Sequence, residues 1–342
     1  MVEAPILMRS LVAIFIMMFF IAAVAWSILL FSRGYFFSYT IVVFGDSLSD
    51  NGNQFASTNN TIPPPDIYPK GRWTNDKTWV EYVADSLNVN LRDMAFGGAT
   101  ADNNIVKSEN IIVKSENSST GTHNKQKYEL SSVKQQLDYF LQNGTEPDKY
   151  QTTYMIWIEN IIDSIQESLT RLSTSVGARK FLINNLPPLE ITPLIQRHFT
   201  TDQQKQLKDL VISHNAQLEV MVKNFSLTSH RVTARVFDVY NLTNEILNDP
   251  DKYHFKNVKD PCLDYYDGIF ANSSSISNSS GIDTSTNVNN TIQPCEERDS
   301  YLFWDRLHPT ARAHHLLADK IVDYLKSPEV KVQVKPWNNK TH

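Results

Sequence analysis

The stretch YTIVVFGDSLSD, residues 39–50, decides the fold. Its first six residues are mostly apolar and rich in β-branched side chains, which is typical of a buried strand. Polar residues follow at once, with Asp46 and Ser47 directly after Gly45. A serine in this position is placed for nucleophilic chemistry, but the same serine could instead cap a following helix. The local pattern leaves both roles open.

Strand-like and helix-like stretches alternate through the rest of the chain. Strands are expected at residues 89–94, 153–158, 180–183 and 235–239, and helices at 78–87, 131–141, 161–172, 201–225 and 309–325. This alternation predicts an α/β fold in which helices cover both faces of a parallel sheet. Ligand sites in such sheets lie outside the carboxyl ends of the strands, so functional residues are expected just after strands.

The composition excludes several classes of protein. With 41% hydrophobic and 11% aromatic residues, the chain is too apolar for a disordered protein. A net charge of −5 gives no basic footprint for nucleic acid, and no ligand-type spacing indicates a metal site. The sequence IVKSEN occurs twice, at residues 105–110 and 112–117. Its polarity predicts an expanded loop rather than a repeat architecture.

Residues 11–31, LVAIFIMMFFIAAVAWSILLF, contain no charged side chain. They are long enough to cross a bilayer as a transmembrane helix, which predicts a membrane anchor. Alternatively, Ala23-Val24-Ala25 is a small-residue cleavage site, which predicts a signal peptide, and we favour this interpretation. Both send the chain to the secretory pathway, as a secreted protein or as one anchored by residues 11–31. We expect an export segment at 1–33, one α/β domain at 34–326 and a polar tail at 327–342.

Two further features agree with export. Nine Asn-x-Ser/Thr sequons predict a glycoprotein, at Asn59, Asn117, Asn143, Asn224, Asn241, Asn272, Asn278, Asn289 and Asn339. Cys262 and Cys295 flank a Ser/Asn-rich segment, residues 272–290, that is typical of a surface loop. In an oxidising compartment a disulfide between them would close this loop, and the alternative is two buried free thiols. We expect the disulfide.

A second group of polar residues, Asp305-Arg306-Leu307-His308-Pro309, stands near the end of the chain. Because a proline disfavours helical backbone in the residue before it, His308 is expected in extended backbone at a helix start, where Asp305 can bond its ring. A serine nucleophile needs such a base, and the base needs an acid that fixes its tautomer. The alternative is a capping interaction beside a surface histidine.

Gly97 and Gly98 offer backbone N–H groups for an oxyanion hole, which is the remaining requirement of such a site. The alternative is that the two glycines only form a tight turn.

Together these stretches resemble the GDSL family of lipases and esterases, also called SGNH hydrolases. The first block of the family is Gly45-Asp46-Ser47-Leu48, the second is similar to residues 93–100, and the last, Asp-x-x-His, is Asp305 to His308. GRWTN at 71–75 with Trp79, LPPL at 186–189 and the cysteine pair resemble the secreted fungal-type carbohydrate acetylesterases. The resemblance covers residues 40–326.

The resemblance implies a flavodoxin-like three-layer αβα sandwich with a parallel sheet of about five strands. It implies that Ser47 is the nucleophile, His308 the general base and Asp305 the residue that orients the base. The implied oxyanion donors are the backbone of Ser47, the backbone of Gly98 and an asparagine side chain from a third block. The family cleaves esters through an acyl-serine intermediate without a cofactor. The expected substrate is a small ester, an acetylated sugar or a short acyl ester, with a lipase or phospholipase as an alternative.

The third block, Gly-x-Asn-Asp in the family, is missing after the strand at 153–158. The chain continues Glu159-Asn160-Ile161-Ile162, so glutamate stands where glycine is expected and Asn160 comes one position early. Asn160 is therefore a doubtful third oxyanion donor, and it could instead cap the next helix. Loss of one donor lowers turnover by roughly 10²–10³. Two alternatives to an active esterase follow: a catalytically impaired protein that binds carbohydrate or lipid, and a membrane-tethered ectodomain whose only membrane contact is the N-terminal segment.

Overall fold

A computed structural model describes residues 40–103, 112–113, 126–127, 132–143, 151–157, 162–264 and 293–327. Several predictions lie outside these residues. They are the export segment, the first copy of IVKSEN, Asn160, the Ser/Asn-rich loop, five of the nine sequons and all but the first residue of the polar tail. All described residues belong to the unit of the chain that begins at Thr40.

The central sheet is parallel throughout and has the order β2-β1-β5-β6-β7. Its strands are β1 (Thr40–Gly45), β2 (Asn90–Asp93), β5 (Thr152–Trp157), β6 (Lys180–Asn184) and β7 (Thr233–Phe237). When these five strands are numbered along the chain, their order in the sheet is 2-1-3-4-5, which is the flavodoxin-like order. Successive strands are added on one side of the first strand and then on the other, so the switch in strand order lies at β1. The predicted α/β fold with a parallel sheet is confirmed. The carboxyl end of β1 is therefore the expected place for a ligand.

Three helices cover one face of the sheet: α3 (Trp79–Leu87), α8 (Val239–Asn248) and α9 (Ala311–Lys326). Alternate residues of β1 point to opposite faces, and Ile41 and Val43 pack on this side with apolar residues of the three helices. The final helix contributes Leu317, Ala318 and Ile321, whose spacing places them on one side of the helix. Helices α8 and α9 of this layer also form part of the wall of a cavity beside Ser47.

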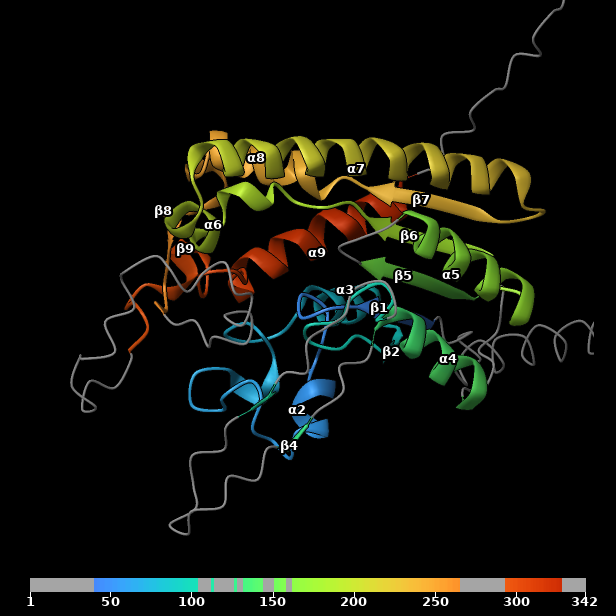
Figure 1. Ribbon diagram of the computed structural model, residues 1–342, viewed down its shortest axis with the longest axis horizontal. Coiled ribbons are helices and arrows are strands. Elements are labelled where there is room, and N and C mark those ends of the chain that lie inside the picture. Colours follow the sequence, from blue (N-terminus) through green and yellow to red (C-terminus); the bar gives the residue numbers. More distant parts are fainter. Residues whose placement is uncertain are drawn as a thin grey trace, which may run out of the picture. The chain divides into compact units, whose positions relative to one another are not determined.

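The opposite face is covered by α4 (Val133–Asn143), α5 (Ile162–Ser175) and α7 (Thr201–Thr228). Val42 and Phe44 of β1 pack here, and the Phe44 ring meets the Phe140 ring of α4 edge to face, with 5.6 Å between centroids. The ribbon shows these helices and the sheet as neighbouring layers (Figure 1). The three-layer sandwich is thus built on two separate apolar clusters.

Shorter elements complete the described part of the chain. They are α2 (Asn53–Ser57), α6 (Pro193–His198), the 3-10 helices Pro69–Gly71, Leu189–Ile191, Asp251–Tyr253 and Arg298–Ser300, and the strands β3 (Ile112–Val113), β4 (Gln126–Lys127), β8 (Asn257–Pro261) and β9 (Tyr301–Phe303). β3 is the start of the second IVKSEN copy and pairs antiparallel with β4. β8 and β9 pair in parallel, and Cys262, just after β8, forms a disulfide with Cys295. Within the described ranges no helix is both long and apolar enough to span a bilayer.

The predicted boundaries differ from the observed ones by up to three residues, and a helix cap explains two of these differences. The strand expected at 235–239 ends at Phe237, because the Asp238 side chain accepts the Asn241 N–H and starts α8 there. The helix expected from Pro309 begins at Ala311, because the Thr310 hydroxyl accepts the Ala313 N–H as its cap. Pro309 instead lies outside the helix, in a bridge with Phe303.

Candidate active site

Ser47 lies in a tight turn directly after β1. The Asp46 carbonyl accepts the N–H groups of Ser49 and Asp50, both at 3.0 Å, and the Asp46 carboxylate accepts the Leu48 N–H at 2.9 Å. These bonds fold the turn back and leave Ser47 half-buried at its tip. The next helix, α2, starts only at Asn53, and Gly52 is its cap residue. Ser47 therefore does not cap a helix, which was the alternative role.

A chain of hydrogen bonds joins Ser47 to the Asp305–His308 segment. The Ser47 Oγ lies 2.9 Å from Nε2 of His308, and Nδ1 of His308 lies 2.7 Å from Oδ2 of Asp305. Oδ1 of Asp305 accepts the backbone N–H groups of Leu307 and His308, each at 2.7 Å. Asp305 thus folds back onto the histidine three residues later, as the spacing predicts. His308 is buried, so it is not a surface histidine.

Two aromatic side chains contact Asp305 and His308 and fix their positions. The Tyr68 hydroxyl donates to Oδ2 of Asp305 at 2.7 Å, and the Trp73 ring stacks on the His308 ring with 5.0 Å between centroids. Trp73 is itself fixed, because its Nε1–H donates to Oε1 of Gln54 at 2.8 Å. The carboxylate of Asp305 and the plane of the imidazole therefore each have a fixed partner.

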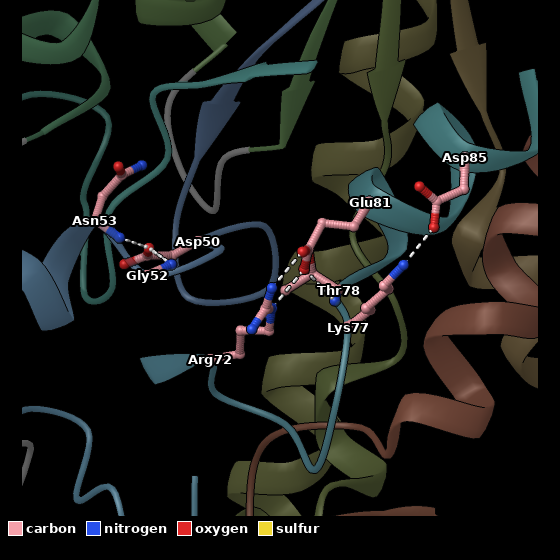
Figure 2. A network of polar contacts seen from close by, with 8 residues as sticks. All are labelled: Asp50, Gly52, Asn53, Arg72, Lys77, Thr78, Glu81 and Asp85. Carbon is pink, nitrogen blue, oxygen red and sulfur yellow. Dashed lines mark hydrogen bonds and ion pairs between the residues drawn. The ribbon is translucent and has the colours of Figure 1, made fainter. Parts of the chain in front are cut away.

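The segment that carries Trp73 is anchored by its neighbour Arg72. The Arg72 guanidinium donates to both carboxylate oxygens of Glu81, and Glu81 also accepts the Thr78 N–H at 3.0 Å, which closes a capping box at the start of α3 (Figure 2). Both side chains of the ion pair are nearly buried, at 12% and 13% exposure. This pair ties residues 72–78 to a helix of the main sandwich.

The Asp305 carboxyl is held in its charged form. Burial alone would raise its pKa, but the charge of His308, the hydrogen bond from His308 and that from Tyr68 outweigh burial and hold the pKa below its ordinary value of 3.8. An ionised carboxylate beside Nδ1 favours the tautomer in which Nε2 is free to accept the Ser47 proton.

Gly97 and Gly98 lie beside the serine turn. The Gly97 N–H donates to Oδ2 of Asp50 at 2.7 Å, and Gly98 has a left-handed backbone with φ of 74°. Within the described part of the chain, the N–H groups of Ser47 and Gly98 make no hydrogen bond. Both residues line the same cavity. Asn160, the doubtful third donor, lies outside the described residues.

Three carboxyl groups near this turn behave differently from Asp305. Burial raises the pKa of Asp46 and of Asp50 to about 6 each. Burial, followed by the negative charge of Asp50, also raises the pKa of Asp93 well above its ordinary value. These groups surround the serine turn without a direct hydrogen bond to a charged side chain among the described residues.

A cavity of about 290 Å³ opens beside Ser47 and His308. Its walls come mainly from α8, α9, β9 and the segment before α6, and most are apolar: Leu48, Ile191, Leu242, Ile246, Leu302 and Leu317. An apolar pocket with a few polar groups at one end is the usual form of a small-molecule site. Among the described residues, no group of three or more His, Cys, Asp or Glu side chains is arranged to hold a metal ion.

The comparison with known families agrees with this geometry. Residues 41–321 match the model of the family described as GDSL-like Lipase/Acylhydrolase. The chain belongs to this family. The resemblance drawn from the sequence is confirmed, and with it the class of enzyme, the carboxylic ester hydrolases.

Three relatives illustrate the range of the family. The thermolabile hemolysin of Vibrio parahaemolyticus is 25% identical over 83% of this chain and 63% of its own length. A GDSL esterase/lipase of Arabidopsis thaliana is 23% identical, with 88% of this chain and 92% of the relative covered. An acetylesterase of Hypocrea jecorina is 24% identical, with 79% and 84% covered. The chain thus spans less than two thirds of the hemolysin and most of the other two.

Sequence reasoning missed four members of the site's surroundings. Tyr68 belongs to none of the motifs, Trp73 stands only within the GRWTN stretch at 71–75, and Asp50 only in the stretch that contains Ser47. His314 is buried, lines the cavity and accepts the Trp79 N–H on Nδ1 at 3.2 Å. Burial lowers the pKa of His314 to about 3, so this imidazole is neutral. The sequence signal for its burial is its spacing, because His314 comes three and four residues before Leu317 and Ala318 and so lies on the apolar side of the helix.

Proposed function

We propose that this chain hydrolyses carboxylic esters through an acyl-serine intermediate. The observation that carries the proposal is the chain of hydrogen bonds from Ser47 to His308 to Asp305, at 2.9 and 2.7 Å, at the mouth of an apolar cavity. A serine, a base and an orienting acid in this geometry are the machinery of acyl transfer. Membership of the GDSL family supports the same chemistry.

In the first half of the reaction, His308 Nε2 takes the proton from Ser47 Oγ as that oxygen attacks the ester carbonyl carbon. The carbonyl oxygen becomes an oxyanion, which the N–H groups of Ser47 and Gly98 stabilise. The C–O bond to the alcohol then breaks, and the alcohol leaves with the proton from His308. In the second half, a water molecule gives a proton to His308 and attacks the acyl-serine, which releases the acid and returns the proton to Ser47.

The cavity favours an apolar acyl group longer than acetyl. Each methylene removed from water contributes about 0.8 kcal/mol, which corresponds to roughly fourfold in binding. An acetyl group would leave most of the 290 Å³ unused. The second candidate substrate is an acetylated carbohydrate, which the Hypocrea jecorina acetylesterase supports.

The test is hydrolysis of p-nitrophenyl acetate, butyrate and octanoate by the purified chain. We expect Ser47→Ala to abolish hydrolysis of all three, while Ser57→Ala, an exposed serine on α2, leaves it unchanged. We also expect kcat/KM to rise about fourfold per added methylene until the cavity is filled. Equal rates for wild type and Ser47→Ala would refute the proposed ester hydrolysis. Binding of ester analogues without any turnover would favour the alternative of a catalytically impaired binding protein. A maximum at acetate would favour the acetylesterase.

We further propose that the protein acts outside the cytosol. Its disulfide joins Cys262 to Cys295, and such bonds persist in oxidising compartments. The four sequon asparagines that the structure describes, Asn59, Asn143, Asn224 and Asn241, are all exposed. Treatment of the cell-derived protein with an N-glycosidase should increase its electrophoretic mobility, and an unchanged mobility would contradict glycosylation. N-terminal sequencing of the same material decides between a cleaved signal and an anchor.

A further inference from the structure

Asp50 stands three residues beyond Ser47 and accepts four backbone N–H groups. Oδ1 accepts those of Gly52 at 2.8 Å and Asn53 at 2.6 Å (Figure 2), and Oδ2 accepts those of Gln54 at 3.1 Å and Gly97 at 2.7 Å. The first three bonds are local and satisfy N–H groups at the start of α2, whose cap residue is Gly52. The fourth reaches a segment 47 residues away. A helix cap does not require that bond.

The segment that contains Gly97 is tied to the serine turn by a second side chain. Nδ2 of Asn53 donates to the carbonyls of Asp93 at 3.1 Å and Ala95 at 2.8 Å. The Phe96 N–H also donates to the Gly45 carbonyl at 3.0 Å. Residues 93–97 are therefore fastened on both sides of Ser47, to the end of β1 before it and to Asp50 and Asn53 after it.

Gly97 is closely surrounded by other residues in this arrangement. A Cβ on Gly97 would lie 2.0 Å from Oε1 of Gln54 and 2.5 Å from Nε1 of Trp73. The bond from the Gly97 N–H to Asp50 holds the peptide bond before Gly97, and the Ala99 N–H, which donates to the Phe96 carbonyl at 3.0 Å, closes the turn that contains the peptide bond after it. That second peptide bond carries the Gly98 N–H, and Gly98 lines the cavity beside Ser47.

We propose that Asp50 is a positioning residue for the oxyanion hole: its carboxylate holds Gly97 so that the Gly98 N–H meets the developing oxyanion at Ser47. The proposal rests on the proposed ester hydrolysis for its kinetic consequence. Preorganised donors of this kind act mainly in the transition state, so their loss lowers kcat and leaves substrate binding almost unchanged.

Two substitutions separate this role from a helix cap. Asp50→Asn keeps one oxygen for Gly52 and Asn53 but turns an NH₂ group toward the N–H groups of Gly97 and Gln54. Asp50→Ser keeps a side-chain oxygen for the local N–H groups of Gly52 and Asn53, but its short hydroxyl does not reach Gly97. Asp102→Asn is the matched control, because Asp102 is also a buried carboxylate but pairs with Lys134.

The experiment measures kcat and KM on p-nitrophenyl butyrate, and the inhibition constant of a trifluoromethyl ketone, whose adduct with Ser47 carries an oxyanion. We expect both Asp50 variants to lose about 10²-fold in kcat, with KM within about threefold of wild type. The inhibition constant should rise by a similar factor. The Asp102→Asn control should change none of the three values by more than about threefold.

Wild-type values for Asp50→Ser would reduce Asp50 to a helix cap and overturn the proposal. A fall in kcat with unchanged affinity for the ketone would overturn it as well, because the oxyanion hole would then be intact. Hydrogen exchange at residues 94–98 provides a readout that does not need turnover, and we expect faster exchange in both Asp50 variants. If the wild type does not hydrolyse esters, the proposed function fails, and unchanged exchange in the variants would separately overturn the positioning role.

Discussion

Two buried carboxylates flank the same serine and accept the same number of hydrogen bonds, yet their acidities move in opposite directions. Asp305 receives bonds from Leu307, from His308 twice and from Tyr68, and its pKa lies below the ordinary value. Asp50 receives four backbone N–H groups, and burial raises its pKa to about 6. The number of donors therefore does not decide the charge state.

The difference lies in the charge of the partners. Asp305 bonds to the ring of His308, which in the proposed reaction becomes positive when it takes the serine proton, and a positive ring favours the ionised carboxylate. Asp50 bonds only to neutral amides, and its negative charge raises the pKa values of its neighbours Asp46 and Asp93. Asp305 thus suits an electrostatic role, whereas Asp50 suits a geometric one.

The largest expected effect comes from Asp305→Asn. An amide cannot stabilise the imidazolium and favours the wrong tautomer of His308, so we expect kcat to fall by about 10⁴. Asp50→Asn is expected to cost only about 10². Steady-state kinetics of the two variants on p-nitrophenyl butyrate measures both values, and losses of equal size would erase the distinction between the two carboxylates.

The second effect is on the pH dependence of stability. Because the pKa of Asp50 is about 6 in the folded protein and 3.8 ordinarily, the folded state binds its proton more tightly. The carboxyl therefore destabilises the fold above pH 6, and this cost disappears as the pH falls toward 4. Asp305 acts in the opposite sense: its stabilisation is present above pH 3.8 and is lost only as the pH falls through its lower folded pKa.

Urea unfolding of wild type and Asp50→Asn at pH 7 and pH 5 tests this assignment. From pH 7 to pH 5 we expect the wild type to gain on the order of 1 kcal/mol relative to Asp50→Asn, which lacks the titrating carboxyl. Buried His314, whose pKa of about 3 works against stability at low pH, is present in both proteins and cancels in the difference. Parallel pH dependences would show that Asp50 does not bind its proton more tightly in the folded protein.

The smallest effect is expected from Tyr68→Phe, which removes one of the four donors to Asp305. A hydrogen bond to a charged group is worth about 1.5 kcal/mol, so kcat should fall by about tenfold while KM stays near its wild-type value. Tyr139→Phe, at an exposed tyrosine of α4, is the control. A Tyr68 variant as active as this control would show that His308 alone keeps Asp305 in place.

Much of the fold could be predicted, because its signals are local. The apolar run of β1 and the stripe of Leu317, Ala318 and Ile321 on α9 follow directly from hydrophobic spacing. Capping explains two of the boundaries that differ from the prediction, since Asp238 and Thr310 each start a helix by a single side-chain bond. The paired strands β8 and β9 were missed because they are short and 39 residues separate the end of β8 at Pro261 from the start of β9 at Tyr301.

Some residues of the candidate site could be predicted from the sequence, and others could not. Ser47, His308 and Asp305 could be named because each stands at a recognisable position after a strand or before a helix. The partners Tyr68, Trp73 and Gln54 could not be, because their contacts depend on how distant loops meet in space. The link from Asp50 to Gly97 is of this second kind, since only the folded chain brings these residues together.

Covalent labelling of Ser47 tests the central claim most directly. A fluorophosphonate reacts with a serine only when a base has activated it and donors accept the developing charge on phosphorus. We expect mass spectrometry of the folded chain to find one phosphonyl group, on Ser47, and to find none in His308→Ala at the same reagent concentration. A folded wild-type chain that takes no label, or takes it equally in His308→Ala, would contradict the account.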